Sequence, residues 1–286
     1  MFSPCRETFF INGSIMMIDF LVLSLSAAAI VVAVRYLLVP GIGQVCAALN
    51  FSIKTRGQII GYATSVPELT MVVAGAVAGV FDAGMWNIAA SNIVNWGLFL
   101  TTVFIFRQQL DLTRKNFIDE ILFGLMSVAV PLALCLITLN VSYWTAAGLI
   151  ALFVVYKYLD RVMNRPTPTT SAAVQSKGSL RSGSLSVLAG IAVVLGSGTF
   201  LGNSANVLIT TLNVPALAVG WLVGLITSVC EFASFIAIYR ANRRKDGPNY
   251  IADTQEALDA LVASNIANLG VILPFGMIVY LIVQGR

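Results

Sequence analysis

Eight long, predominantly apolar segments constrain this chain more than any other feature of its sequence. They span residues 17–40, 59–80, 83–105, 117–139, 144–158, 185–212, 216–239 and 256–283. A helix needs about 20 such residues to cross the hydrocarbon core of a bilayer. No segment alternates with a period of two over helical length, which disfavours a β-barrel. We therefore expect an all-α, polytopic membrane protein with about eight transmembrane helices.

The composition supports a membrane protein and excludes several other classes. Only 10% of the 286 residues are charged and 58% are hydrophobic, whereas soluble domains carry about 25% charged residues. A cytosolic enzyme and a secreted disulfide scaffold are excluded on this basis. The absence of histidine removes imidazole metal sites and Ser-His or Cys-His nucleophile pairs. We expect no enzyme activity, because no lysine lies deep in a span to activate a serine.

The basic residues indicate how the chain is oriented in the membrane. Fifteen of the 17 lysines and arginines lie in or beside the first, third, fifth and seventh connections, and Arg6 and Arg286 lie near the termini. Lysine and arginine mark cytoplasmic loops. We therefore expect cytoplasmic basic loops, external termini and a location in the cell (inner) membrane. The basic charge orients the chain in the lipid bilayer and implies no nucleic-acid partner.

Two sequence motifs each occur twice, in the same order. The pattern GxxTSVxE occupies residues 61–68 and 224–231, and ASNIxNxG occupies residues 90–97 and 263–270. On the predicted topology the two copies run in opposite directions through the membrane, so the repeats are inverted. Inverted repeats place a substrate site near the midplane, where the copies meet. We expect a first repeat over residues 1–160, a cytoplasmic linker over 161–184 and a second repeat over 185–286.

Glu68 and Glu231, which end the two GxxTSVxE motifs, are the only acidic residues well inside apolar spans. A carboxylate at the bilayer centre costs a few kcal/mol even on lenient insertion scales. No lysine or arginine lies deep enough to pair with either glutamate, so they are protonated or neutralised by a cation. Two facing glutamates supply two charges and up to four oxygens, which suits one Ca²⁺ or two Na⁺. We favour cation binding over a purely structural protonated pair.

Neutral oxygen-bearing residues accompany each glutamate at helical spacing. A spacing of three or four residues places side chains on one helix face, and hydroxyl and amide oxygens can complete a hard-cation shell without adding charge. Interhelical hydrogen bonding is the alternative role for each residue taken singly. Together with the glutamates, the candidate ligands are Thr64, Ser65, Thr227, Ser228, Ser91, Asn95, Ser264 and Asn268.

At these residues the sequence resembles the membrane region of sodium/calcium exchangers, within the cation/calcium exchanger superfamily. Two alpha-repeats of that family carry GTSxPE-like and GNxxGSNIxN-like motifs. The resemblance implies electrogenic antiport of Ca²⁺ against Na⁺, with alternating access by sliding of the first and sixth helices and no cofactor besides the transported ions. It assigns Glu68 and Glu231 as the central cation-coordinating glutamates, and the eight neutral residues named above as further ligands.

The sequence departs from the family pattern at several positions. Cys230 stands where the second repeat usually has the proline that corresponds to Pro67, which predicts a less sharply broken helix there. Both SNIxN motifs end in asparagine, which disfavours potassium dependence. The last two of the family's ten spans are expected to be lacking. Two other functions stay open: H⁺-coupled cation exchange, such as Ca²⁺/H⁺ exchange, and a non-transporting membrane protein with a degenerate exchanger fold.

Overall fold

The computed structural model describes residues 4–137, 141–163, 179–210, 213–243 and 250–285, and every regular element within these ranges is a helix. The first half of the chain contains α1 (Pro4–Ala33), the π-helical turn η1 (Val34–Leu38), α2 (Val39–Ala48), α3 (Ile53–Thr64), α4 (Val66–Val77), α5 (Phe81–Ile105), the 3₁₀ turns η2 (Gln109–Thr113) and η3 (Lys115–Phe117), α6 (Ile118–Leu136) and α7 (Tyr143–Met163). The second half contains α8 (Leu180–Thr210), α9 (Ala216–Arg243), α10 (Tyr250–Ala267), the π-helical turn η4 (Asn268–Ile272) and α11 (Leu273–Val283).

The predicted membrane spans correspond to these helices. By length and composition, seven segments in the described part of the chain can cross a membrane, and they are Met17–Ala48, Ile53–Val77, Phe81–Ile105, Ile118–Leu136, Leu180–Thr210, Ala216–Arg240 and Ala252–Val283. The fifth predicted span, 144–158, is α7, which has 21 residues and packs against η4 and α11. Lys157, Asp160 and Arg161 make α7 less apolar than the others. The prediction of an all-α polytopic membrane protein is confirmed.

The predicted linker is partly helical. Helix α7 continues to Met163 and α8 begins at Leu180, so both helices extend into the predicted 161–184 segment. Residues 164–178 of that segment lie outside the described residues. The first span also continues past residue 40 to Ala48, through η1 and α2.

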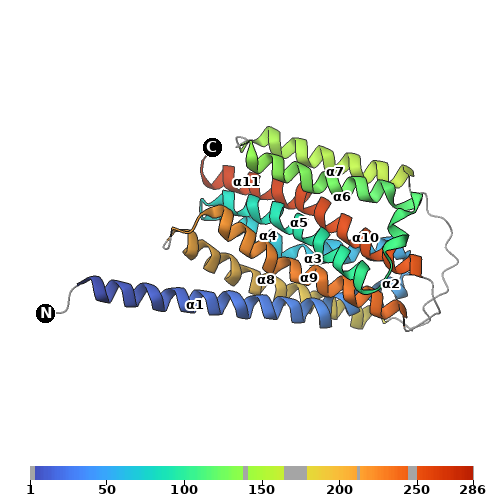
Figure 1. The fold of residues 1–286 in the computed structure, drawn as a ribbon, viewed down its shortest axis with the longest axis horizontal. Coiled ribbons are helices and arrows are strands. Elements are labelled where there is room, and N and C mark those ends of the chain that lie inside the picture. Colours follow the sequence, from blue (N-terminus) through green and yellow to red (C-terminus); the bar gives the residue numbers. More distant parts are fainter. Residues whose placement is uncertain (1–3, 138–140, 164–178, 211–212, 244–249, 286) are drawn as a thin grey trace.

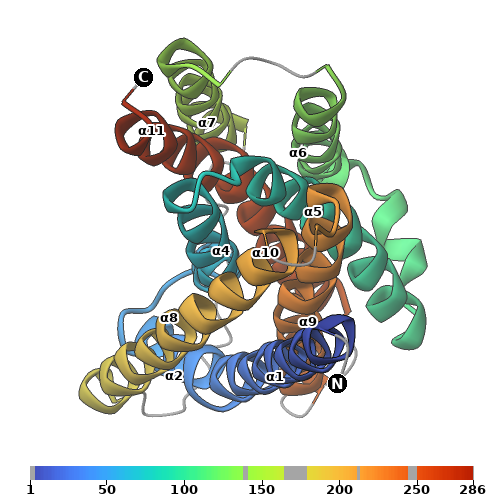
Figure 2. The ribbon, with the colours of Figure 1, turned by 90° about the vertical axis from the view of Figure 1, so that its left-hand side faces the viewer.

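Each helix that carries a motif packs against a motif-bearing helix of the other repeat, and the two pairs are equivalent. Helix α3 lies against α10, and its counterpart α9 lies against α5, the counterpart of α10. Helices α1 and α8 pack together at one side of the bundle, and α6 and α7 lie at the opposite side, separated from each other (Figures 1 and 2). The motif-bearing helices therefore form the centre of the molecule.

Glycines bring the central helices into close contact at equivalent positions of the two repeats. A methyl group at any of these glycines would approach a backbone oxygen of the facing helix within about 3 Å or less, so no larger residue fits without a shift. Close helix approach through glycines four residues apart is common in membranes. The glycines are Gly57 and Gly61, which face Glu256 and Ala260, and Gly220 and Gly224, which face Ala83 and Asn87.

The two repeats differ at the glycine that ends each ASNIxNxG motif. A Cβ atom on Gly270 would lie 2.5 Å from the Cβ of Phe153 and 3.2 Å from the carbonyl oxygen of Leu149, both on α7. At Gly97, the equivalent glycine of α5, no atom of the described chain lies within 4 Å of such a Cβ. Helix α7 therefore covers the glycine of the second motif, and no described helix covers that of the first in this way.

Candidate cation-binding site

The helix containing the first GxxTSVxE motif is broken within the motif. Helix α3 ends at Thr64, and α4 begins at Val66 with Pro67 in its first turn; Ser65 between them has φ −83° and ψ 0°. Because proline lacks an N–H and restricts the residue before it, a helix tends to begin anew here. The break places Glu68 in the first turn of α4. Free N–H groups and the helix dipole favour a negative charge at that position.

The second motif lies in an unbroken helix. Helix α9 runs from Ala216 to Arg243 through Cys230, as the replacement of proline by cysteine predicts. Glu231 is 1% exposed, and its counterpart Glu68 is 0% exposed. The two glutamates are thus equally buried, although their helices have different local geometry.

The hydroxyl residues of both motifs surround the glutamates. Ser264 on α10 donates a hydrogen bond to Glu231 Oε1 at 3.1 Å, and its hydroxyl lies 2.8 Å from that of Ser65. Thr64 and Thr227, each four residues before the glutamate of its own motif, are both 1% exposed. Both threonines direct their hydrogens to backbone carbonyls of their own helices, at 3.1–3.3 Å. Their oxygen lone pairs stay available to another ligand.

The serines near the crossing of α5 and α9 make backbone contacts. Ser91 donates its hydroxyl to the carbonyl of Ile88 at 3.3 Å, within its own helix. Ser228 donates to the carbonyl of Ser91 at 3.4 Å. Both side chains are fully buried. The predicted ligands Ser91 and Ser228 are therefore present at the repeat interface, but they do not bond to a glutamate.

Four asparagines form a symmetric cluster between α5 and the α10–η4 segment. Asn95 donates its amide to Asn265 Oδ1 at 3.0 Å, and Asn268 donates to Asn92 Oδ1 at 2.9 Å. Asn92 and Asn265 also donate to each other's backbone carbonyls, at 3.2 and 3.1 Å. Sequence reasoning missed these last two residues, although the second position of each SNIxN motif is asparagine. Their role is to orient Asn95 and Asn268.

Several buried side-chain oxygens of the predicted ligands lack a hydrogen-bond partner, as do a few oxygens elsewhere in the described chain, among them those of Asn87 and Asp259. At the predicted ligands they are Oε1 and Oε2 of Glu68, Oε2 of Glu231, and Oδ1 of Asn95 and of Asn268. Buried polar atoms are nearly always paired, so each unpaired atom requires an explanation. Five such oxygens, all acceptors, are suited to binding a hard cation.

No protein cation neutralises the two glutamates within the described residues. The ion pairs found there involve other carboxylates, and none includes Glu68 or Glu231. The described ranges also contain no group of three or more acidic or cysteine side chains arranged to hold a metal. A cation bound here would therefore depend on two carboxylates and several neutral oxygens.

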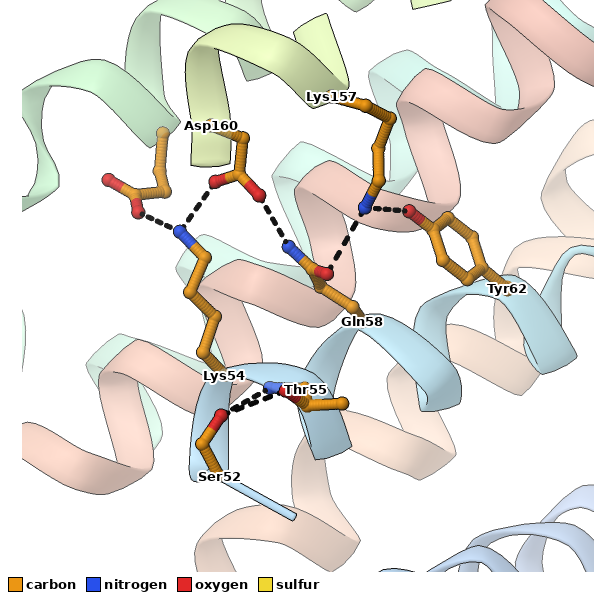
Figure 3. Close-up of polar contacts among 8 residues, drawn as sticks. Ser52, Lys54, Thr55, Gln58, Tyr62, Lys157 and Asp160 are labelled. Atoms are coloured by element: carbon orange, nitrogen blue, oxygen red, sulfur yellow. Dashed lines mark hydrogen bonds and ion pairs between the residues drawn. The ribbon is translucent and has the colours of Figure 1, made fainter. Parts of the chain in front are cut away.

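A separate ionic network at the Ile53 end of α3 lies outside this site. Lys54 bonds to Asp160 at 2.6 Å and to Glu120 at 3.2 Å, which ties α3 to α7 and α6 (Figure 3). Gln58 donates to Asp160 at 3.0 Å and accepts from Lys157 at 3.2 Å, and Lys157 also donates to Tyr62. These contacts were not predicted. The polar spacing of Lys54, Gln58 and Tyr62 along one face of α3 is the signal that could have revealed them.

One of the comparisons with known proteins gives a match. The family model for the sodium/calcium exchanger protein matches residues 19–160 and 182–286, which together are most of the chain. Neither the curated proteins nor the solved structures give a match. The matched residues include both copies of each motif and all of the candidate ligands. The chain belongs to the sodium/calcium exchanger protein family.

Proposed function

We propose that this protein is a membrane cation antiporter that exchanges Na⁺ for Ca²⁺ by alternating access, with the ions bound between the two repeats. The family membership supports cation exchange. The observation that carries the proposal is the group of five unpaired acceptor oxygens on Glu68, Glu231, Asn95 and Asn268, all fully buried. Without a bound cation, this group would be strongly unfavourable inside a membrane.

The chemistry of the site suits both ions. Ca²⁺ takes about six to eight oxygen ligands and tolerates irregular geometry. Two glutamates neutralise its charge, and the asparagine oxygens and the hydroxyls of Thr64 and Thr227 add neutral ligands. Two Na⁺ ions carry the same charge, so they can replace Ca²⁺ without leaving an uncompensated carboxylate. This charge match is the basis for exchange at one site.

The packing of α8 supports a moving part next to the site. Gly198 and Gly202 of α8 lie directly against Thr70 and Ala74 of α4, with no room for a Cβ at either glycine. Helix α4 carries Glu68 in its first turn. Smooth glycine surfaces allow one helix to slide along another, so displacement of α1 and α8 would open the site alternately to each side of the membrane.

Proton-coupled cation exchange is the second candidate. It is favoured by the Glu68 carboxyl, both of whose oxygens lack a regular hydrogen-bond donor in the described structure. A buried carboxyl without donors binds a proton readily. On this alternative, protons replace Na⁺ as the counter-ion at the same glutamates.

Flux through proteoliposomes tests the proposal and separates the two candidates. Vesicles loaded with Na⁺ should take up radioactive calcium, and Glu68→Gln or Glu231→Gln should reduce uptake to the level of protein-free vesicles. Asp82→Asn, at an exposed position in the first turn of α5, is the matched control and should transport normally. Uptake driven by a pH gradient in sodium-free buffer would favour proton coupling. Normal uptake in both glutamine variants would refute the site.

A further inference from the structure

Asn87 on α5 is a buried polar residue that the proposed exchange site does not use. Its side chain is 0% exposed, and neither Oδ1 nor Nδ2 has a hydrogen-bond partner. An amide has one strong acceptor and two donors, and leaving them unpaired in the interior is unfavourable. Such a residue points to a ligand or to water.

The position of Asn87 places it in line with the candidate ligands. It precedes Ser91 by four residues and Asn95 by eight, so the three share one face of α5. Helix α9 packs closely here, because Gly220 and Gly224 face the backbone of Asn87. Asn87 thus lies at the interface of the two repeats, one turn closer than Ser91 to the Phe81 end of α5.

The second repeat has no equivalent polar group. The residue that matches Asn87 is Ala260, which faces Gly61 as Asn87 faces Gly224. The neighbouring positions are the same in both repeats, with serine at 91 and 264 and asparagine at 95 and 268. The additional amide is therefore present in the first repeat only, whereas in the second repeat the buried Asp259 precedes Ala260.

We propose that Asn87 is an additional cation ligand, which lines the route between the Phe81 end of α5 and the Glu68–Glu231 site. This inference rests on the proposed cation exchange. The amide oxygen would coordinate a hydrated Na⁺ or Ca²⁺ ion in transit, and the amide nitrogen would hold one of its waters. Because Ala260 offers no such group, the route from the opposite side lacks this ligand. Cation affinity therefore differs between the two faces of the membrane.

Thiol labelling tests whether this route exists, independently of transport. Asn87→Cys is introduced into a chain in which Cys5, Cys46, Cys135 and Cys230 are replaced by serine or alanine, and Ala260→Cys in the same background is the matched control. A membrane-impermeant methanethiosulfonate added at the face where α5 begins should label Asn87→Cys and not Ala260→Cys. Ca²⁺ or Na⁺ should slow that labelling several-fold. Absence of labelling from this face, or labelling that neither cation slows, would overturn the inference.

A sided flux measurement provides the second test. Asn87→Ala, which introduces the residue of the second repeat, should raise the half-saturating Ca²⁺ concentration at the Phe81 face about tenfold, as expected for the loss of about 1.4 kcal/mol of binding energy. At the opposite face the change should be less than twofold. An equal change at both faces would show a merely structural role. If the unaltered protein transports neither ion, the proposed function fails, while the labelling still decides the role of Asn87.

Discussion

At the scale of single residues, the site depends on asparagines that orient other asparagines. Asn92 and Asn265 hold the amides of Asn268 and Asn95 by reciprocal bonds of 2.9 and 3.0 Å. With the amide nitrogens committed in this way, the oxygens of Asn95 and Asn268 are left as the free acceptors. Residues that never touch a cation would thus determine which atoms are offered to it.

Replacing Asn265 by alanine tests this dependence. The change removes two hydrogen bonds of the Asn265 side chain, one accepted from the Asn95 amide and one donated to the Asn92 carbonyl, and leaves both buried partners without that bond. Each unpaired group costs about 1–3 kcal/mol, so the free energy of unfolding should fall by about 2–4 kcal/mol. Thermal unfolding of the purified protein measures the loss, with Asn203→Ala at an exposed position of α8 as control. Equal melting temperatures for the two variants would show that the cluster contributes nothing.

At the scale of helices, the glycines that end the two ASNIxNxG motifs differ in how they are packed. Gly270 accommodates α7 in close contact, and its counterpart Gly97 faces open space in the described structure. The local sequences are similar, but Gly97 lies in the α-helix α5 and Gly270 in the π-helical turn η4, and only Gly270 is covered by α7. The pair therefore tests how firmly α7 packs on η4.

Leucine substitutions at the two glycines should give different results. Gly270→Leu would collide with Phe153 and displace α7, which should lower the free energy of unfolding by about 1–3 kcal/mol, as for other overpacked positions. Gly97→Leu should change it by no more than about 0.5 kcal/mol. Chemical or thermal unfolding in one detergent compares both variants. Similar destabilisation by the two would contradict the observed packing of α7 on Gly270.

Features of these helices that depend on neighbouring residues in the sequence could be predicted, and features that depend on distant segments could not. The spans and the repeated motifs could be predicted, because apolar length and local pattern are properties of contiguous residues. The unbroken α9 followed from one substitution, cysteine for proline at residue 230. The contact of Gly270 with Phe153 and the bonds of Lys54 to Glu120 and Asp160 could not be predicted. They depend on segments far apart in the sequence.

At the scale of the whole molecule, equivalent residues of the two repeats are alike at the centre of the bundle and different at the ends of the central helices. The ligands and glycines match in pairs, whereas Lys54, Gln58 and Tyr62 of α3 correspond to Leu217, Trp221 and Leu225 of α9. The Ile53 end of α3 is therefore charged and bonded to α6 and α7 (Figure 3). The corresponding end of α9 has apolar side chains at these positions. The two repeats are therefore most alike at the candidate ligands and at the glycines around them.

Equilibrium binding of radioactive calcium to the purified protein tests the central claim most directly, because it does not require transport. Unaltered protein should bind Ca²⁺ with saturation, and Na⁺ should displace it. Glu68→Gln and Glu231→Gln should each abolish this binding, and Asp82→Asn should retain it. Saturable, sodium-sensitive binding that survives in both glutamine variants would place the cation elsewhere and contradict the assignment of Glu68 and Glu231.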